Sequence, residues 1–119
     1  MNIITRIIFA TLLICYGISA HAQMSEEAKI EHLIASIEKM PEGTKFVRNG
    51  VEYGSEKAAQ HLRMKYEKGK KYAATAELFI ENIASKSYMT GEKYLIKFAD
   101  GTTMTARDFF LAELEKIKN

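Results

Sequence analysis

The stretch from 46 to 66 constrains the fold more than any other, because it runs from a tight hairpin straight into a helix. Asn49-Gly50 lies between two short strand-like segments, and both residues accept the positive φ angles of a type I′ turn. This register pairs Phe46 with Tyr53 and places Arg48 on the same face of the hairpin. The sequence therefore predicts two antiparallel strands with Phe46, Tyr53 and Arg48 on one face.

The second half of this stretch predicts a helix. Gly54 breaks the strand, and Ser55 is expected to cap a helix that runs from Glu56 to about 68. His61 and Lys65 stand one turn apart on a common face of that helix. Consecutive elements joined by a short connection usually lie side by side. We therefore expect Arg48, His61 and Lys65 to share one corner of the domain.

The segments before and after this stretch predict three further helices. Ser25 is expected to cap the first helix, and Pro41 to end it. The next begins at Thr75, and the last follows Thr105, which has a capping-box spacing to Asp108. Each has apolar residues at helical spacing. In chain order, these apolar positions are Ile30, Leu33, Ile34 and Ile37; Ala76, Phe79, Ile80, Ile83 and Ala84; and Phe109, Phe110, Leu114 and Ile117.

A second hairpin is expected before the last helix. The segment 94–98 alternates as a strand, and Asp100-Gly101 predicts a second type I′ turn that returns through Thr102 to Met104. The order is therefore helix–hairpin–helix, occurring twice. A lone hairpin is marginal in water, so each hairpin must pack on helices or pair with the other. The sequence predicts a single small α+β domain with four helices and two β-hairpins.

The first 22 residues read as a secretory signal peptide. Arg6 precedes an apolar run of 12 residues, which is too short to span a bilayer, and an Ala-x-Ala site predicts cleavage after Ala22. Cys15 lies inside the run, next to a bulky Ile14 that disfavours lipidation, and should leave with the signal. We expect a periplasmic or secreted protein, with its domain at 23–119 and no stable membrane anchor after cleavage.

The predicted mature chain is 97 residues long and has no cysteine, so its stability must come from its core. Removal of Arg6 leaves 16 basic against 15 acidic residues, a balance that does not favour nucleic acid or an anionic membrane surface. Two scattered histidines without cysteine are too few for a structural zinc site. We expect no metal and no cofactor.

Two functional hypotheses follow from the polar residues. Arg48, Asn49, His61 and Lys65 could bind an anionic group, because a guanidinium forks onto carboxylate or phosphate and a helix start offers amides nearby. Protonation of the imidazole would strengthen such a site at mildly acidic pH. The simpler interpretation is that each basic side chain is only solvated. The sequence alone leaves this choice open.

The second hypothesis is a small serine hydrolase, with Ser85 or Ser87 as nucleophile and His61 as base. No Gly-x-Ser-x-Gly elbow is present, and no acid is assigned to orient the histidine. A polar loop that fixes the end of the third helix explains both serines more simply. The residues favour a site for a ligand or partner over an enzyme.

The chain also resembles an uncharacterised family of small exported bacterial proteins, a domain of unknown function. The resemblance extends over nearly all of the predicted mature chain, with Tyr88 and Thr90 where the family pattern has serines. It implies export and a common fold, and it implies no activity. The motifs that carry the resemblance are Phe46-Val47-Arg48-Asn49-Gly50, Tyr53, Ala58-Ala59, His61-Leu62, Lys65-Tyr66, Phe79-Ile80, Ile83-Ala84-Ser85-Lys86-Ser87, Gly91 and Tyr94-Leu95.

Together these observations predict an exported, soluble, non-enzymatic binding module. Its ligand or partner would be a small anion or another envelope protein, for which it could also act as an inhibitor or assembly factor. A binding site there would include Arg48, Asn49, His61 and Lys65, with Ser85 and Ser87 beside them.

Overall fold

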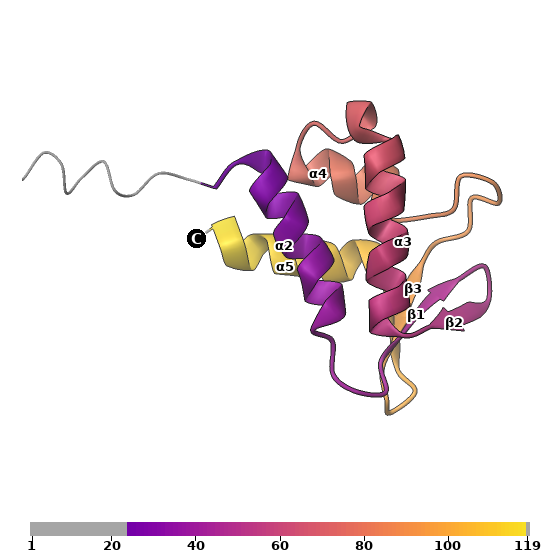
Figure 1. The fold of residues 1–119 in the computed structure, drawn as a ribbon. Coiled ribbons are helices and arrows are strands. Elements are labelled where there is room, and N and C mark those ends of the chain that lie inside the picture. Colours follow the sequence, from indigo (N-terminus) through magenta and orange to yellow (C-terminus); the bar gives the residue numbers. More distant parts are fainter. Residues whose placement is uncertain (1–23, 119) are drawn as a thin grey trace, which may run out of the picture.

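The computed structural model describes residues 24–118, so the predicted signal peptide and its cleavage site lie outside the described residues. The described chain forms one α+β domain with four α-helices and a four-stranded antiparallel sheet (Figure 1). The predicted fold class is therefore confirmed. The α-helices are α2 (Glu26–Glu38), α3 (Ser55–Lys68), α4 (Ala76–Phe79) and α5 (Ala106–Lys118). The strands are β1 (Lys45–Arg48), β2 (Val51–Tyr53), β3 (Leu95–Lys97) and β4 (Thr103–Thr105).

The two hairpins pair with each other to form the sheet, in the order β2-β1-β3-β4. Tyr53 lies opposite Phe46, Phe46 opposite Ile96, and Ile96 opposite Met104. Successive residues of a strand point to opposite faces, so these four side chains form one row across the sheet. Phe46 and Ile96 at its centre are fully buried. This row is the surface on which the helices pack.

The helices close the core on that face of the sheet. In Figure 1, α2 and α5 lie beside each other, and α3 stands between them and the hairpin β1–β2. All four predicted apolar residues of the first helix are buried. Of the last helix, Phe110 and Leu114 are buried, whereas Phe109 and Ile117 are partly buried. Amphipathic periodicity thus predicted the buried faces of the first and last helices.

The turns confirm one prediction and contradict another. Asn49 and Gly50 have φ angles of 48° and 78°, as a type I′ turn requires. The second turn is not of this type, since Asp100 does not adopt a positive φ. There the Gly101 amide donates to the Phe98 carbonyl at 2.9 Å, and only Gly101, with φ 90°, is left-handed. The Asp100 carboxylate instead accepts the Thr102 amide at 2.9 Å, an Asx-type closure of a three-residue loop.

Two helix starts follow the predictions and one does not. The Ser25 hydroxyl accepts the Ala28 amide, and the Thr105 hydroxyl accepts the Asp108 amide, each at 3.1 Å. Ser55 does not cap its helix. Gly54 occupies the N-cap with extended backbone, and Ser55 is already the first helical residue. A glycine N-cap costs only a few tenths of a kcal/mol relative to serine, so the helix begins one residue earlier.

The third predicted helix begins as predicted but changes its winding. Thr75 caps α4 through the Leu78 amide at 3.1 Å, and α4 continues into the π-helical segment η2 (Ile80–Ala84). The five predicted apolar positions from Ala76 to Ala84 are all fully buried. A π-helical turn places carbonyl groups out of the usual α-helical ladder, where other groups can bind them.

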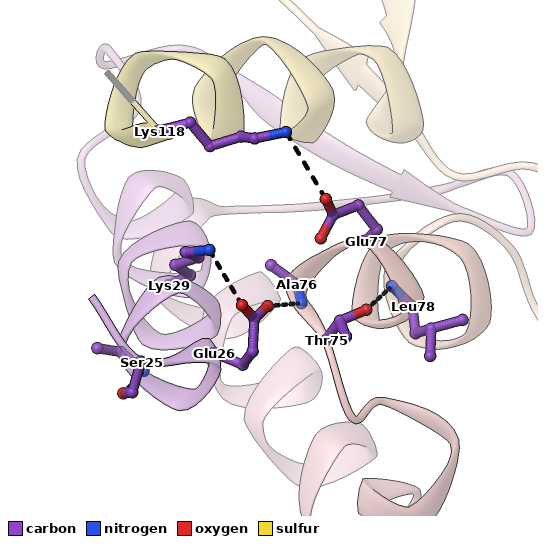
Figure 2. Close-up of polar contacts among 9 residues, drawn as sticks. Ser25, Glu26, Lys29, Thr75, Ala76, Glu77, Leu78 and Lys118 are labelled. Carbon is purple, nitrogen blue, oxygen red and sulfur yellow. Dashed lines mark hydrogen bonds and ion pairs between the residues drawn. The ribbon is translucent and has the colours of Figure 1, made fainter. Parts of the chain in front are cut away.

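The start of α4 is held by a side chain from a distant part of the chain (Figure 2). The Glu26 carboxylate on α2 accepts the Ala76 amide at 2.8 Å through Oε1 and pairs with Lys29 at 3.0 Å through Oε2. These contacts lower the pKa of Glu26 below its usual value, chiefly through the Ala76 amide and then through Lys29. Glu26 therefore acts as a second cap of α4, supplied by tertiary structure.

Candidate functional site

Lys65 on α3 is the centre of the predicted corner, and its ammonium group has three oxygen acceptors. Its Nζ donates to the Ile83 carbonyl at 2.7 Å, to the Lys86 carbonyl at 2.8 Å and to the Tyr94 hydroxyl at 2.9 Å. An ammonium group has three protons, so every donor of Lys65 has a partner. Lys65 thereby ties α3 to the end of η2 and to the segment that enters β3.

Two aromatic rings complete the surroundings of this ammonium. Its Nζ lies 4.3 Å from the ring centroid of Tyr88 and 4.7 Å from that of Tyr94. Both distances are within the range in which a ring face attracts a cation. Burial and, after it, the charge of Arg48 together lower the pKa of Lys65 to about 8. At pH 7 about nine tenths of the side chain is still protonated.

His61 lies one turn before Lys65 and is half-buried. Its pKa falls to about 4, first because burial disfavours the charged ring and then because Arg48 and Lys65 repel it. The prediction that this histidine charges at mildly acidic pH is therefore wrong for the protein without a ligand. The imidazole is neutral at pH 6, and its buried Nε2 has no hydrogen-bond partner in the described structure.

Arg48 reaches the same corner from the end of β1. Its guanidinium carbon lies 5.4 Å from the ring centroid of Tyr53, and its buried Nε has no hydrogen-bond partner among the described residues. Its charge lowers the pKa values of both His61 and Lys65. The structure thus brings Arg48, His61 and Lys65 together, although whether they bind a ligand stays a prediction.

A small hollow of about 150 Å³ lies beside Arg48 and His61. Phe46, Tyr53, Ala58 and Met64 supply its apolar lining, and Lys57 adds a second cation beside Arg48. No carboxylate lines it among the described residues. This volume is smaller than a typical small-molecule pocket and is suited to a single end group.

Asn49, Ser87 and Thr90 hold the hairpin turn against the loop that follows η2. The Thr90 hydroxyl donates to the Asn49 side-chain oxygen at 2.6 Å, and the Asn49 amide group contacts the Ser87 hydroxyl oxygen at 3.5 Å. Ser87 Oγ also accepts the amides of Met89 and Thr90 at 3.3 and 3.4 Å. Asn49 and Ser87 therefore hold the hairpin turn and this loop together.

Ser85 is buried and has a structural partner. Its hydroxyl donates to the Ile80 carbonyl, five residues earlier, and so closes the end of η2. Within residues 24–118, His61 is not a hydrogen-bond partner of Ser85 or of Ser87. The geometry gives no nucleophile–base pair of the kind that the serine hydrolase hypothesis requires.

A larger groove of about 720 Å³ lies on the other side of Lys65 and was not predicted. Its walls carry the exposed rings of Tyr72 and Tyr88, and Lys68 and Lys86 stand at its rim. Tyr88 donates to the Asn82 carbonyl at 2.7 Å, and the Asn82 side chain donates to the Tyr72 carbonyl at 2.6 Å. The only signal in the sequence was the concentration of tyrosine and lysine in segments 65–72 and 86–88.

The described residues contain no group of three or more His, Cys, Asp or Glu side chains that could hold a metal ion. Among residues 24–118, no helix has both the length and the apolar character that a membrane crossing needs. The described structure has two hollows, each lined by basic side chains and by aromatic rings.

The fold and these hollows define a small α+β domain with a candidate binding surface. By sequence, the chain belongs to a family of unknown function, DUF5329, whose model matches residues 24–118. It is also similar to the uncharacterized protein YfeK of Salmonella typhimurium, with 37% identity over 75 residues. This match covers 63% of the chain and 62% of the relative. No solved structure matches the chain.

Proposed function

We propose that this chain is exported to the periplasm and that its domain is a non-enzymatic binding module. The cationic corner, defined as Arg48, His61 and Lys65, would receive an anionic end group of a ligand or partner. One observation carries this proposal. Arg48 Nε and His61 Nε2 are both buried, neither has a hydrogen-bond partner among residues 24–118, and both residues line the same hollow.

Buried polar atoms without partners are rare in native proteins, because each costs about 1–3 kcal/mol. A carboxylate in the hollow would accept a hydrogen bond from each of these two N–H groups and would lie close to the fixed charge of Lys65. Lys57 would add attraction from the rim. Charge-assisted hydrogen bonds of this kind are about twice as strong as neutral ones.

Binding of an anion should also change the protonation of His61. Without a ligand, burial and then the charges of Arg48 and Lys65 hold its pKa at about 4. A bound carboxylate would offset these charges and raise the pKa, and by linkage the affinity would increase as the pH falls. We therefore still expect the affinity for an anion to increase on acidification, but at a lower pH than the sequence predicted.

The test is an NMR titration of the histidine rings with sodium propionate, whose size suits the hollow. We expect propionate to raise the pKa of His61 by at least half a unit, and Arg48→Gln to abolish this effect. His32, exposed on α2, is the internal control. An unchanged His61, or an equal response at His32 that reflects ionic strength alone, would contradict the proposal.

Export is tested separately. Expression of the full chain in a bacterial host, followed by fractionation and intact-mass measurement, should give periplasmic protein that begins at Gln23 and carries no lipid. A mass that retains Cys15 with acyl chains would contradict the predicted processing, and protein confined to the cytoplasm would contradict export.

A further inference from the structure

Three lysines and His61 form a row along one side of α3 that joins the small hollow to the large groove. Lys57, His61, Lys65 and Lys68 are spaced at i, i+4, i+8 and i+11, and so lie along one side of the helix. Lys57 and His61 line the hollow, whereas Lys65 and Lys68 line the groove. From Lys57 to Lys68 the row extends about 16 Å, at about 1.5 Å per residue.

The charges at this surface have few internal partners. Lys57, Lys68 and Lys86 are exposed, and within the described chain none of them has a carboxylate within ion-pair distance. Glu81, which also lines the groove, is paired with Arg107 at 2.7 Å. The surface therefore has a net positive potential although the whole chain is almost neutral.

Exposed apolar groups accompany these charges. Met64 lines the small hollow and is 55% exposed, Tyr88 lines the groove and is 62% exposed, and Met89, the next residue in the chain, is 96% exposed. The Tyr88 ring is held by the Lys65 ammonium and by its own hydrogen bond to Asn82. A fixed aromatic ring loses little freedom on binding, and Tyr and Met side chains are enriched at protein interfaces.

We infer that the hollow and the groove form one extended site for an acidic segment of another polypeptide. An extended chain rises about 3.3 Å per residue, so about five residues would span the row. One acidic side chain would enter the hollow, a second would lie between Lys68 and Lys86, and an apolar side chain would pack on Tyr88. This inference deepens the proposed function and rests on it.

The test begins with selection from a phage-displayed library of random heptapeptides on the domain. We expect enrichment of peptides with two acidic residues separated by two to four positions, with an apolar or aromatic residue between them. The most enriched peptide is then synthesised with a fluorophore, and its affinity is measured by anisotropy. Replacement of its acidic residues by Asn and Gln should weaken binding at least tenfold.

Charge reversal locates the site. Lys68→Glu combined with Lys86→Glu should weaken the peptide at least tenfold but leave the response of His61 to propionate unchanged. The matched control, Lys39→Glu with Lys45→Glu, makes the same change in net charge on exposed positions away from the row and should stay within twofold. Circular dichroism should show all variants folded.

Each other outcome has a definite meaning. Propionate binding at His61 without any acidic peptide, or with a peptide insensitive to Lys68→Glu/Lys86→Glu, would overturn the extended site and leave the proposed function standing. Loss of the propionate response would overturn the proposed function itself. A concentration-dependent dimer disrupted by the same reversal, or binding of a glycan in place of peptides, would also overturn the inference.

Discussion

The two ends of the helical segment 76–84 are both held by charged side chains from other helices, but in different ways. At its start, the Glu26 carboxylate accepts the Ala76 amide, and at its end the Lys65 ammonium donates to the Ile83 carbonyl (Figure 2 shows the first end). Each charge opposes the partial charge of the helix terminus that it meets. The segment is only nine residues long, and tertiary caps replace the stability that longer helices gain from propensity.

The two ends differ in burial. The Glu26 side chain is 38% exposed, and its hydrogen bonds favour the charged form, so its pKa is lowered. Lys65 is more enclosed, and burial with the charge of Arg48 disfavours its charged form, so its pKa falls to about 8. An exposed cap is stabilising at little cost, whereas an enclosed cap must satisfy every donor. This is why three oxygen atoms surround Lys65.

The largest effect on stability is expected from Lys65→Met, which removes the charged group at the enclosed end. Loss of the ammonium leaves two backbone carbonyls and the Tyr94 hydroxyl without their partner, so we expect the free energy of unfolding to fall by about 2–4 kcal/mol. Urea denaturation measures this, with Lys68→Met one turn later as the exposed control. The simpler interpretation of the sequence, in which Lys65 is only solvated, predicts no loss of stability. A loss below 0.5 kcal/mol, by order of magnitude a surface effect, would restore that prediction.

The second prediction concerns His61, at the enclosed end. Its pKa is about 4 in the folded protein and close to 6.5 in the unfolded chain, so the unfolded chain binds more protons between these values. Stability should therefore fall as the pH is lowered from 6.5 to 4, by about 2 kcal/mol after allowance for partial solvent exposure.

His61→Gln removes the titrating group and should flatten this part of the stability–pH curve, whereas His32→Gln should not. Denaturation curves at half-unit pH intervals decide the point. Parallel curves for wild type and His61→Gln would show that carboxylates alone cause the acid sensitivity.

The third prediction concerns Gly69, the C-cap residue of α3, which lies against Ile83 of η2 at the enclosed end. A Cβ atom at this position would lie 2.8 Å from the Ile83 Cδ1 atom and 3.3 Å from the Lys65 carbonyl oxygen. Ile83 is fully buried and has little room to move, so Gly69→Ala should cost about 1–2 kcal/mol. Gly54→Ala, with no atom within 4 Å, should cost a few tenths of a kcal/mol. Thermal melting of the two variants gives the difference, and equal losses would contradict the close packing.

The smallest effect is expected at the exposed end. Glu26→Gln keeps an acceptor for the Ala76 amide but removes the charge, so we expect a loss of about 0.5–1 kcal/mol. Since the pKa of Glu26 is lowered by folding, this contribution is present above pH 4.5 and should disappear as the pH falls further. Glu27→Gln, exposed in the same turn, is the control. A loss that persists at pH 2.5 would show that the amide geometry, and not the charge, is responsible.

The sequence by itself determined the local parts of this protein. The I′ turn at Asn49-Gly50, the caps at Ser25, Thr75 and Thr105, and the buried apolar faces of the helices each depend on residues within a few positions of one another. Asp100 shows the limit of such signals, because its carboxylate has a local alternative in the Thr102 amide.

Only the tertiary structure decided what the polar residues of the candidate site do. The pairing of β1 with β3, the Glu26 cap fifty positions before Ala76 and the Lys65 contacts with η2 join residues far apart in the sequence. The sequence predicted that Arg48, His61 and Lys65 share one corner. It contained no signal for the π-helical segment, whose end provides a carbonyl acceptor for Lys65. Long-range partners and burial set these pKa values, and neither is encoded in the spacing of nearby residues.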